Sequence, residues 1–166
     1  MVAILGDTGA RLSEIAGLAL GDLKLDAETP HVVIQEHPWR SLKNTASSRS
    51  VPLLGHALWA AQRVAERATK GQRWAFPRYC DGKTTKATHA SNTIAKWIRT
   101  LKVEGKLMDH TAHELRHTMA DRLRDVQCPE DIREAIGGWT TKGVAAQYGK
   151  GYSLRVMADW LGKVTL

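Results

Sequence analysis

The stretch AHELRH, residues 112–117, is compatible with two chemistries. His113, Glu114 and His117 fit the H-E-x-x-H pattern, in which two His one helical turn apart bind zinc and the Glu acts as a base. The same stretch places His113 and Arg116 three residues apart, so that a base and a fixed positive charge share one helix face. The first interpretation predicts a zinc peptidase, and the second predicts chemistry on a phosphodiester.

The zinc interpretation is the weaker of the two. Arg116 lies inside the motif, and its guanidinium would repel a metal ion held on the same helical turn. A third ligand is also needed, but no His follows His117 in the chain. We therefore expect no metal and no cofactor. Taken alone, the pentapeptide could also be an ordinary charged turn of an exposed helix.

Composition indicates one basic globular domain. The 166 residues are 43% hydrophobic and 25% charged, as in average globular proteins. The formal net charge of +7 and the pI near 9.6 favour a polyanionic partner. There is no run of eighteen apolar residues and no secretory signal pattern, and the two cysteines, Cys80 and Cys128, cannot form a disulfide framework. These features predict a cytoplasmic protein without a membrane partner.

The first third of the chain predicts a helix followed by a small sheet. Apolar residues recur at helical spacing in ARLSEIAGLAL (10–20), which places Arg11 at a helix start. HVVIQEH (31–37) is rich in β-branched residues, and residues 39–53 resemble a polar hairpin that ends in a short apolar strand. We expect a small antiparallel sheet of about three strands.

The remainder predicts helices, so the expected class is α+β and mainly helical. Thr111 and Glu114 form a possible capping box, which puts His113 and Arg116 in the first turn of a helix where an anion is favoured. Pro129 is expected in the first turn of another helix, and Gly137 and Gly138 at its end. Helical segments are expected at residues 56–68, 90–103, 130–136, 144–152 and 154–162.

Four segments offer groups for phosphoryl transfer without a metal. That reaction needs positive donors around the phosphate, a nucleophile in line and an acid for the leaving oxygen. The segments are TGARLSE (8–14), a hairpin that contains Lys43, HELRH (113–117) and GGWTTKGVAAQY (137–148).

In order and spacing these segments resemble the catalytic domain of tyrosine recombinases, the phage integrase family. The matching motifs are TG-x-R-x-SE, a hairpin lysine before R-x-VPL, HELRHT, and a Trp nine residues before a Tyr. The likeness covers about residues 4–160. It implies a site-specific recombinase of a phage or mobile element, encoded by a bacterium or phage, that cuts and rejoins double-stranded DNA through a 3′-phosphotyrosyl intermediate.

The resemblance implies roles for residues that bind the phosphate and move protons. Arg11 and Arg116 would bind the non-bridging oxygens of the scissile phosphate, for which forked guanidiniums are suited. Lys43 would protonate the leaving 5′ oxygen, although Arg40 and Arg49 lie in the same hairpin and a shift in register would move that role. Arg11, Lys43 and Arg116 would thus also be DNA-binding residues.

The resemblance also implies the nucleophile and its neighbours. Tyr148 would attack phosphorus, and His113 would assist proton transfer to or from it. Trp139 stands where His is commoner in the family; its indole N–H can donate to a phosphate oxygen but cannot shuttle a proton. Tyr152 is the rival nucleophile, and Glu14 would orient Arg11.

Further expectations concern the extent and assembly of the protein. Because relatives have a helix and a core-binding domain before the first motif, we expect residues 1–166 to be a single, N-terminally truncated catalytic domain. It would be a monomer alone and a tetramer on DNA, with the segment 154–162 docking on its own core or on a neighbour. The alternatives are a degenerate, non-catalytic DNA-binding remnant and an enzyme similar to type IB topoisomerases.

Overall fold

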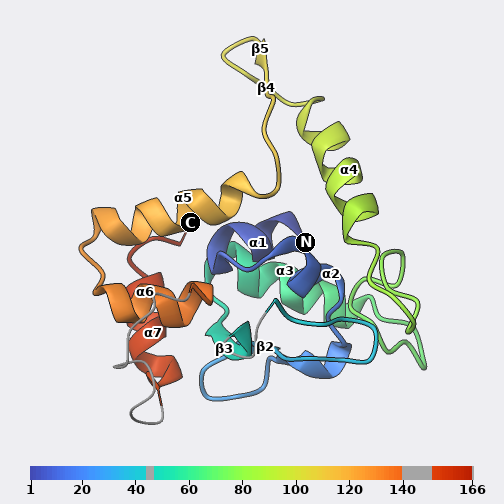
Figure 1. Cartoon of the computed structure of the whole chain (residues 1–166), viewed down its shortest axis with the longest axis horizontal. Coiled ribbons are helices and arrows are strands. Elements are labelled where there is room, and N and C mark those ends of the chain that lie inside the picture. Colours follow the sequence, from blue (N-terminus) through green and yellow to red (C-terminus); the bar gives the residue numbers. More distant parts are fainter. Residues whose placement is uncertain (44–46, 140–150, 166) are drawn as a thin grey trace.

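The computed structural model describes residues 1–43, 47–139 and 151–165 (Figure 1). Helices and short strands follow one another along the chain in an α+β arrangement that is mainly helical, as expected. The described elements are α1 (Val2–Thr8), α2 (Leu12–Ala16), the 3₁₀ turn η1 (Leu20–Asp22), β1 (Leu23–Lys24), β2 (His31–Ile34), β3 (Arg49–Pro52), α3 (Gly55–Glu66), α4 (Ala87–Ile98), β4 (Lys102–Val103), β5 (Lys106–Leu107), α5 (Glu114–Asp125), α6 (Glu130–Gly137) and α7 (Leu154–Leu161).

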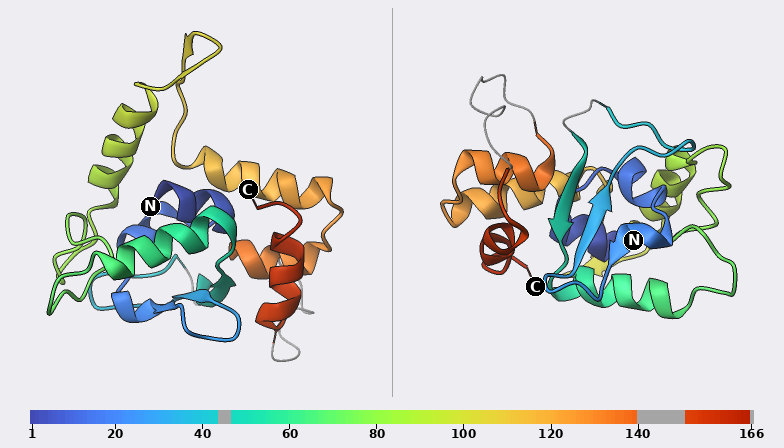
Figure 2. Two further views of the ribbon diagram at one scale, coloured as in Figure 1. Left: turned by 180° about the vertical axis from the view of Figure 1, so that it is seen from behind. Right: turned by 90° about the horizontal axis from the view of Figure 1, so that it is seen from below.

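The predicted sheet is present. It has the order β1-β2-β3 and is antiparallel throughout, with Val32 opposite both Leu23 and Val51. Val32, Ile34 and Val51 are completely buried, as expected for the core-facing side of a strand with period two. The views in Figure 2 place α6 and α7, in orange and red, on one side of β3, and both helices pack against that strand.

Helix α1 occupies the centre of the molecule, between α3 and α5 (Figure 1). Its Ile4 and Leu5 are fully buried, and they join a core to which the sheet and all the larger helices contribute. The helix ends at Gly9, which has φ 62° and is therefore in the left-handed region that favours glycine. After this turn only Ala10 separates Gly9 from Arg11, the residue that caps α2.

The helix expected over residues 10–20 is shorter than predicted. Arg11 does stand at its start, but α2 ends at Ala16. Beyond it the backbone pairs with a distant segment: the N–H of Ala75 donates to Leu18 O (2.9 Å), and the N–H of Leu20 donates to Arg73 O (2.8 Å). These long-range hydrogen bonds replace those that would have continued the helix.

Helix α4 and the hairpin β4–β5 project from the body of the protein (Figure 1). The helix expected over residues 90–103 ends earlier, because α4 stops at Ile98 and Lys102–Val103 form β4. Ile94 and Ile98 are buried and Trp97 is exposed, since only the inner side of this projecting helix meets the core.

The C-terminal helix α7 packs against β3 of its own chain, with Met157 and Leu161 buried. Most of the helix expected at residues 144–152 lies outside the described residues. None of the described helices has both the length and the apolar character needed to cross a membrane.

Candidate active site

Arg11 is positioned by a reciprocal cap at the start of α2. Its backbone N–H donates to one carboxylate oxygen of Glu14 (2.7 Å), and its Nη1 donates to the other (2.7 Å). Nη1 also reaches Oγ of Ser47 (3.1 Å), and Nη2 donates to the carbonyl of Gly138 (3.2 Å). The side chain is 23% exposed, so part of the guanidinium remains available to a ligand.

Arg116 lies in the first turn of α5 and is buried. Its Nη1 donates to the carbonyl oxygens of Gly9 and Gly137, the latter at 2.6 Å. Burial, followed by the positive charges of Arg11 and Arg49, lowers the pKa of Arg116 to about 10. That value is far enough above neutrality for the guanidinium to remain charged at pH 7.

Trp139 follows the end of α6 and packs against Arg116. The guanidinium carbon of Arg116 lies 4.7 Å from the centre of the indole ring, in a cation–π contact. The ring packs so closely on Gly137 that a Cβ added there would come within 2.2 Å of it. Gly138 follows with φ 62° and reverses the chain. Of the two glycines expected to end this helix, Gly137 therefore also makes room for the indole, and Gly138 makes room for the guanidinium of Arg49.

Three of the predicted residues are thus brought together although they are far apart in the chain. Arg11 donates to the carbonyl of Gly138, Arg116 donates to those of Gly9 and Gly137, and the Trp139 ring packs on Gly137 and on the guanidinium of Arg116. The first two present guanidiniums, and the third presents an indole, beside backbone that carries no side chain. This arrangement is suited to holding a tetrahedral anion.

Arg49 belongs to the same cluster; the sequence placed it in the R-x-VPL motif and as an alternative to Lys43, but not beside Glu14. It lies on β3 and donates from Nη2 and Nη1 to the two carboxylate oxygens of Glu14, at 3.0 and 3.3 Å. Although burial alone would raise the pKa of Glu14, the hydrogen bond and charge of Arg49, helped by Arg11, bring it below its ordinary value. The buried carboxylate is therefore ionised and shared by two guanidiniums.

Lys43 is exposed and stands at the end of a well-anchored loop. Arg40 in that loop is buried and donates to the carbonyl oxygens of Glu14 and Gln35. The indole N–H of Trp39 donates to Gly17 O (2.9 Å). These bonds anchor the loop to α2 at Arg40, three residues before Lys43, while residues 44–46, which follow Lys43, lie outside the described part.

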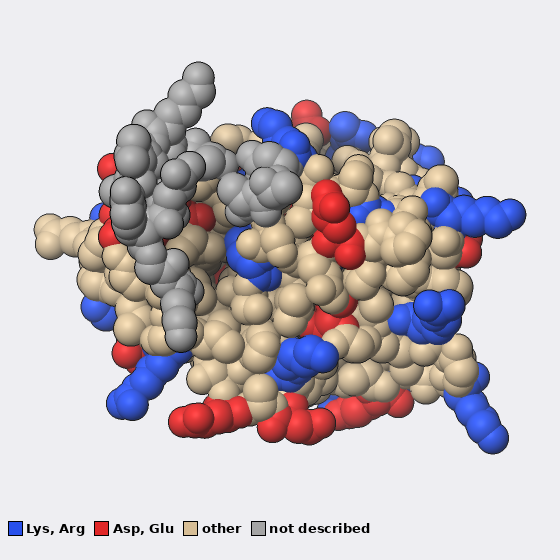
Figure 3. Space-filling view, turned by 60° about the horizontal axis from the view of Figure 1, so that its bottom comes forward, with Lys and Arg blue, Asp and Glu red and all other residues tan. Residues whose placement is uncertain are grey.

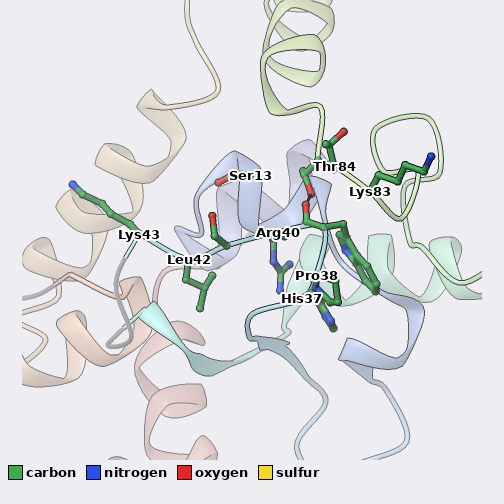
Figure 4. A pocket seen from close by; sticks show the side chains of 11 residues that line it. Ser13, His37, Pro38, Arg40, Leu42, Lys43, Lys83 and Thr84 are labelled. Carbon is green, nitrogen blue, oxygen red and sulfur yellow. Dashed lines mark hydrogen bonds between the residues drawn. The ribbon is translucent and has the colours of Figure 1, made fainter.

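A hollow of about 550 Å³ opens beside this loop (Figure 4). Ser13, Lys43 and Lys83 line it, and none of its described lining residues is acidic. In Figure 4 the Lys43 and Lys83 side chains point to opposite sides. The hollow therefore does not gather their two ammonium groups on a single ligand.

His113 directly precedes α5, one turn before the side chain of Arg116, and the N–H of Arg116 donates to its carbonyl (3.1 Å). The expected capping box is present in part: the carboxylate of Glu114 accepts from the backbone N–H of Thr111 (3.0 Å). His113 and His117 are in edge contact, with ring centres 4.7 Å apart. Within residues 1–43, 47–139 and 151–165, no three His, Cys, Asp or Glu side chains form a group that could hold a metal ion.

The predicted nucleophile, Tyr148, lies outside the described residues. The rival Tyr152 is described, and its hydroxyl donates to the carboxylate of Asp131 on α6. That hydrogen bond raises the pKa of Tyr152 and lowers that of Asp131. A phenol held by a carboxylate in this way is a poorer nucleophile than one surrounded by positive charge.

Charge on one face of the molecule is mixed. Figure 3 shows Lys and Arg side chains dispersed over this face, with Asp and Glu along its lower edge. The charge excess of the whole chain is therefore not visible here as one basic patch. Arg11, Arg49 and Arg116 form a separate group of positive charge, in which Arg11 and Arg49 are close enough to lower the pKa of Arg116.

Comparison with known proteins identifies one matching family profile and several similar solved structures. The sequence profile described as "Phage integrase family" matches residues 1–153. A search of curated proteins found no match. Among solved structures, the Tn1549 transposon integrase in complex with transposon right end DNA is similar, with a TM-score of 0.65 and 19% identity over 96% of this chain and 52% of that one.

A second structure of the Tn1549 transposon integrase, in complex with circular intermediate DNA, has a TM-score of 0.59 and 18% identity over 96% of this chain and 53% of that one. The chain therefore spans about half the length of the solved structures it matches. These likenesses confirm the mainly helical α+β fold. Because the family profile covers nearly all of the sequence, the chain belongs to the phage integrase family.

Proposed function

We propose that this protein is the catalytic domain of a tyrosine recombinase, which cuts and rejoins double-stranded DNA at specific sites. The observation that carries the proposal is that Arg11, Arg116 and Trp139, from three distant segments, meet at the backbone of Gly9, Gly137 and Gly138. The matched integrase structures are described as DNA complexes, which supports DNA as the substrate. The substrate would be bacterial or phage DNA in the cytoplasm.

In the cleavage step, Arg11 and Arg116 bind the non-bridging oxygens of the scissile phosphate. The Tyr148 hydroxyl attacks phosphorus and forms a 3′-phosphotyrosyl bond while the bond to the 5′ oxygen breaks. Lys43 gives a proton to that leaving oxygen, and His113 assists the loss of the proton from Tyr148. Trp139 adds an indole N–H donor to the phosphate.

Rejoining is the reverse reaction. A 5′ hydroxyl attacks the phosphotyrosyl phosphorus, the phenol leaves, and the DNA backbone is restored. The bond energy is kept in the phosphotyrosine, so no nucleotide cofactor is consumed. On DNA we propose that four such domains assemble, whereas the isolated domain is a monomer.

The proposal is tested by covalent capture of DNA. The wild-type chain is incubated with a pool of nicked duplexes that carry a randomised central segment, and complexes resistant to SDS are collected. We expect such complexes, and mass spectrometry after nuclease digestion should place the phosphate adduct on Tyr148. Tyr148→Phe should abolish capture, and Tyr152→Phe should retain it.

Other outcomes would identify the alternatives. DNA binding without any covalent complex would favour a non-catalytic DNA-binding remnant. An adduct on Tyr152 would overturn the assignment of the nucleophile. Capture that leads to relaxation of supercoiled plasmid but never to exchange between duplexes would favour a topoisomerase-like enzyme.

A further inference from the structure

Arg49 contacts three separate segments that carry the proposed active site. Its Nε donates to the carbonyl of Ile136 in the last turn of α6 (2.9 Å), and its Nη1 donates to the carbonyl of Ser47 at the end of the hairpin (2.8 Å). Its Nη groups bind both oxygens of Glu14 on α2. We infer that Arg49 is a positioning residue that fixes Trp139 relative to Arg11; this inference rests on the proposed function.

The contact with Gly138 shows how one arginine can set the place of Trp139. A Cβ added to Gly138 would lie 2.6 Å from Nη1 of Arg49, so the guanidinium packs directly on that backbone. Arg11 donates to the carbonyl of the same glycine through Nη2 (3.2 Å). Gly138 is therefore held between two guanidiniums, and Trp139 is the next residue in the chain.

Only an arginine can make this set of contacts. The planar fork has five N–H donors, and here they are divided between a carboxylate and two backbone carbonyls that belong to different segments. The side chain is 7% exposed, so water does not replace a lost contact. A lysine keeps the charge at this position but cannot bind Glu14 and Ile136 at once.

The charge of Arg49 gives a second reason why this residue supports phosphate binding. Glu14 alone would cancel the charge of Arg11, which must instead attract a phosphate. Arg49 also pairs with that carboxylate. The cluster therefore holds three guanidiniums, those of Arg11, Arg49 and Arg116, and one buried negative charge. The two positive charges in excess equal the two negative charges that the phosphodiester group carries once a deprotonated tyrosine has added to it, one more than in the ground state.

The test uses Arg49→Lys and Arg49→Met in the full chain, with Arg63→Lys as the matched control. Arg63 is an exposed arginine on α3 that pairs with Glu66, far from the motif residues in sequence. Two readouts are needed: the rate of covalent DNA capture beside the affinity for non-covalent DNA binding, and the indole N–H signals in ¹H–¹⁵N spectra. Trp139→Phe identifies the signal of Trp139, and the signal of Trp74, whose indole nitrogen is buried, reports that the fold is retained.

We expect Arg49→Lys to move the Trp139 signal, to leave the Trp74 signal in place and to slow capture by about tenfold to 100-fold at unchanged DNA affinity. Arg49→Met should slow capture further, and Arg63→Lys should change neither readout. A Trp139 signal that stays in place in Arg49→Lys overturns the inference, whatever happens to capture. If the wild-type chain captures no DNA, the proposed function fails, and the Trp139 signal alone decides the role of Arg49.

Discussion

Replacing Glu14 by Gln should destabilise the protein severely, because this carboxylate is the negative centre of the arginine cluster. Its side chain is 2% exposed, and its partners Arg49 and Arg11 are 7% and 23% exposed. Removing one partner of a buried ion pair typically costs about 3–5 kcal/mol, because the remaining charges stay buried without compensation. A domain of this size has a free energy of unfolding of about 5–15 kcal/mol, so the loss is a large fraction.

The effect should depend on pH in a defined direction. The pKa of Glu14 is lowered in the folded state, so its stabilisation is fully present above the ordinary carboxyl value of 4.5 and is lost as the pH falls through the folded pKa. The difference between wild type and Glu14→Gln should therefore be complete at pH 7. It should shrink steadily once the pH is below about 4.5.

Urea denaturation at several pH values measures both effects, and thermal unfolding should show a midpoint lower by about 6–12 °C for a loss of about 3 kcal/mol. Glu66→Gln is the matched control, since it breaks an exposed pair with Arg63 and should cost less than about 1 kcal/mol. A Glu14→Gln variant within about 1 kcal/mol of wild type at pH 7 would show that the carboxylate does not hold the arginines together.

Three further predictions concern individual contacts. Gly138→Ala should cost about 1–3 kcal/mol of unfolding free energy, because φ is 62° and the new Cβ meets Arg49; Gly71→Ala, also at positive φ but in open space, should cost less, and equal costs by urea denaturation would exclude the Arg49 contact. Tyr152→Phe should raise the pKa of Asp131 towards its ordinary value, since the tyrosine hydroxyl is the main cause of its lowering; an NMR titration of the carboxyl carbon that shows no change would contradict that hydrogen bond. Lys83→Met should reduce the slope of log affinity against log salt for duplex DNA by about 0.9 if Lys83 beside the hollow contacts one phosphate, and an unchanged slope would remove it from the interface.

Sequence patterns predicted the parts of the fold that local chemistry dictates. The start of α2 at Arg11, the three-stranded sheet and the end of α6 at the glycine pair all follow from caps, turn residues and periodicity. The hairpin β4–β5 was missed, although Glu104 and Gly105, both with positive φ, form a turn whose glycine was a usable signal.

Other features depend on contacts that no local pattern contains. Helix α2 stops early because residues 18–20 bond to residues 73–75, more than fifty positions away. The contacts of Arg49 could not be predicted for the same reason, since its partners Glu14 and Ile136 are 35 and 87 residues distant in the chain. The order of the motifs predicted Arg11, Arg116 and Trp139 as site residues. Only the folded chain shows that Arg49 joins them.

A crystal structure of this chain soaked with orthovanadate would test the central claim most directly. Vanadate resembles a phosphate group that is being attacked by a nucleophile. We predict that its oxygens accept hydrogen bonds from the guanidiniums of Arg11 and Arg116 and from the indole N–H of Trp139. An anion bound elsewhere, with this cluster empty at saturating vanadate, would contradict the proposal that the three residues form the site of phosphoryl transfer.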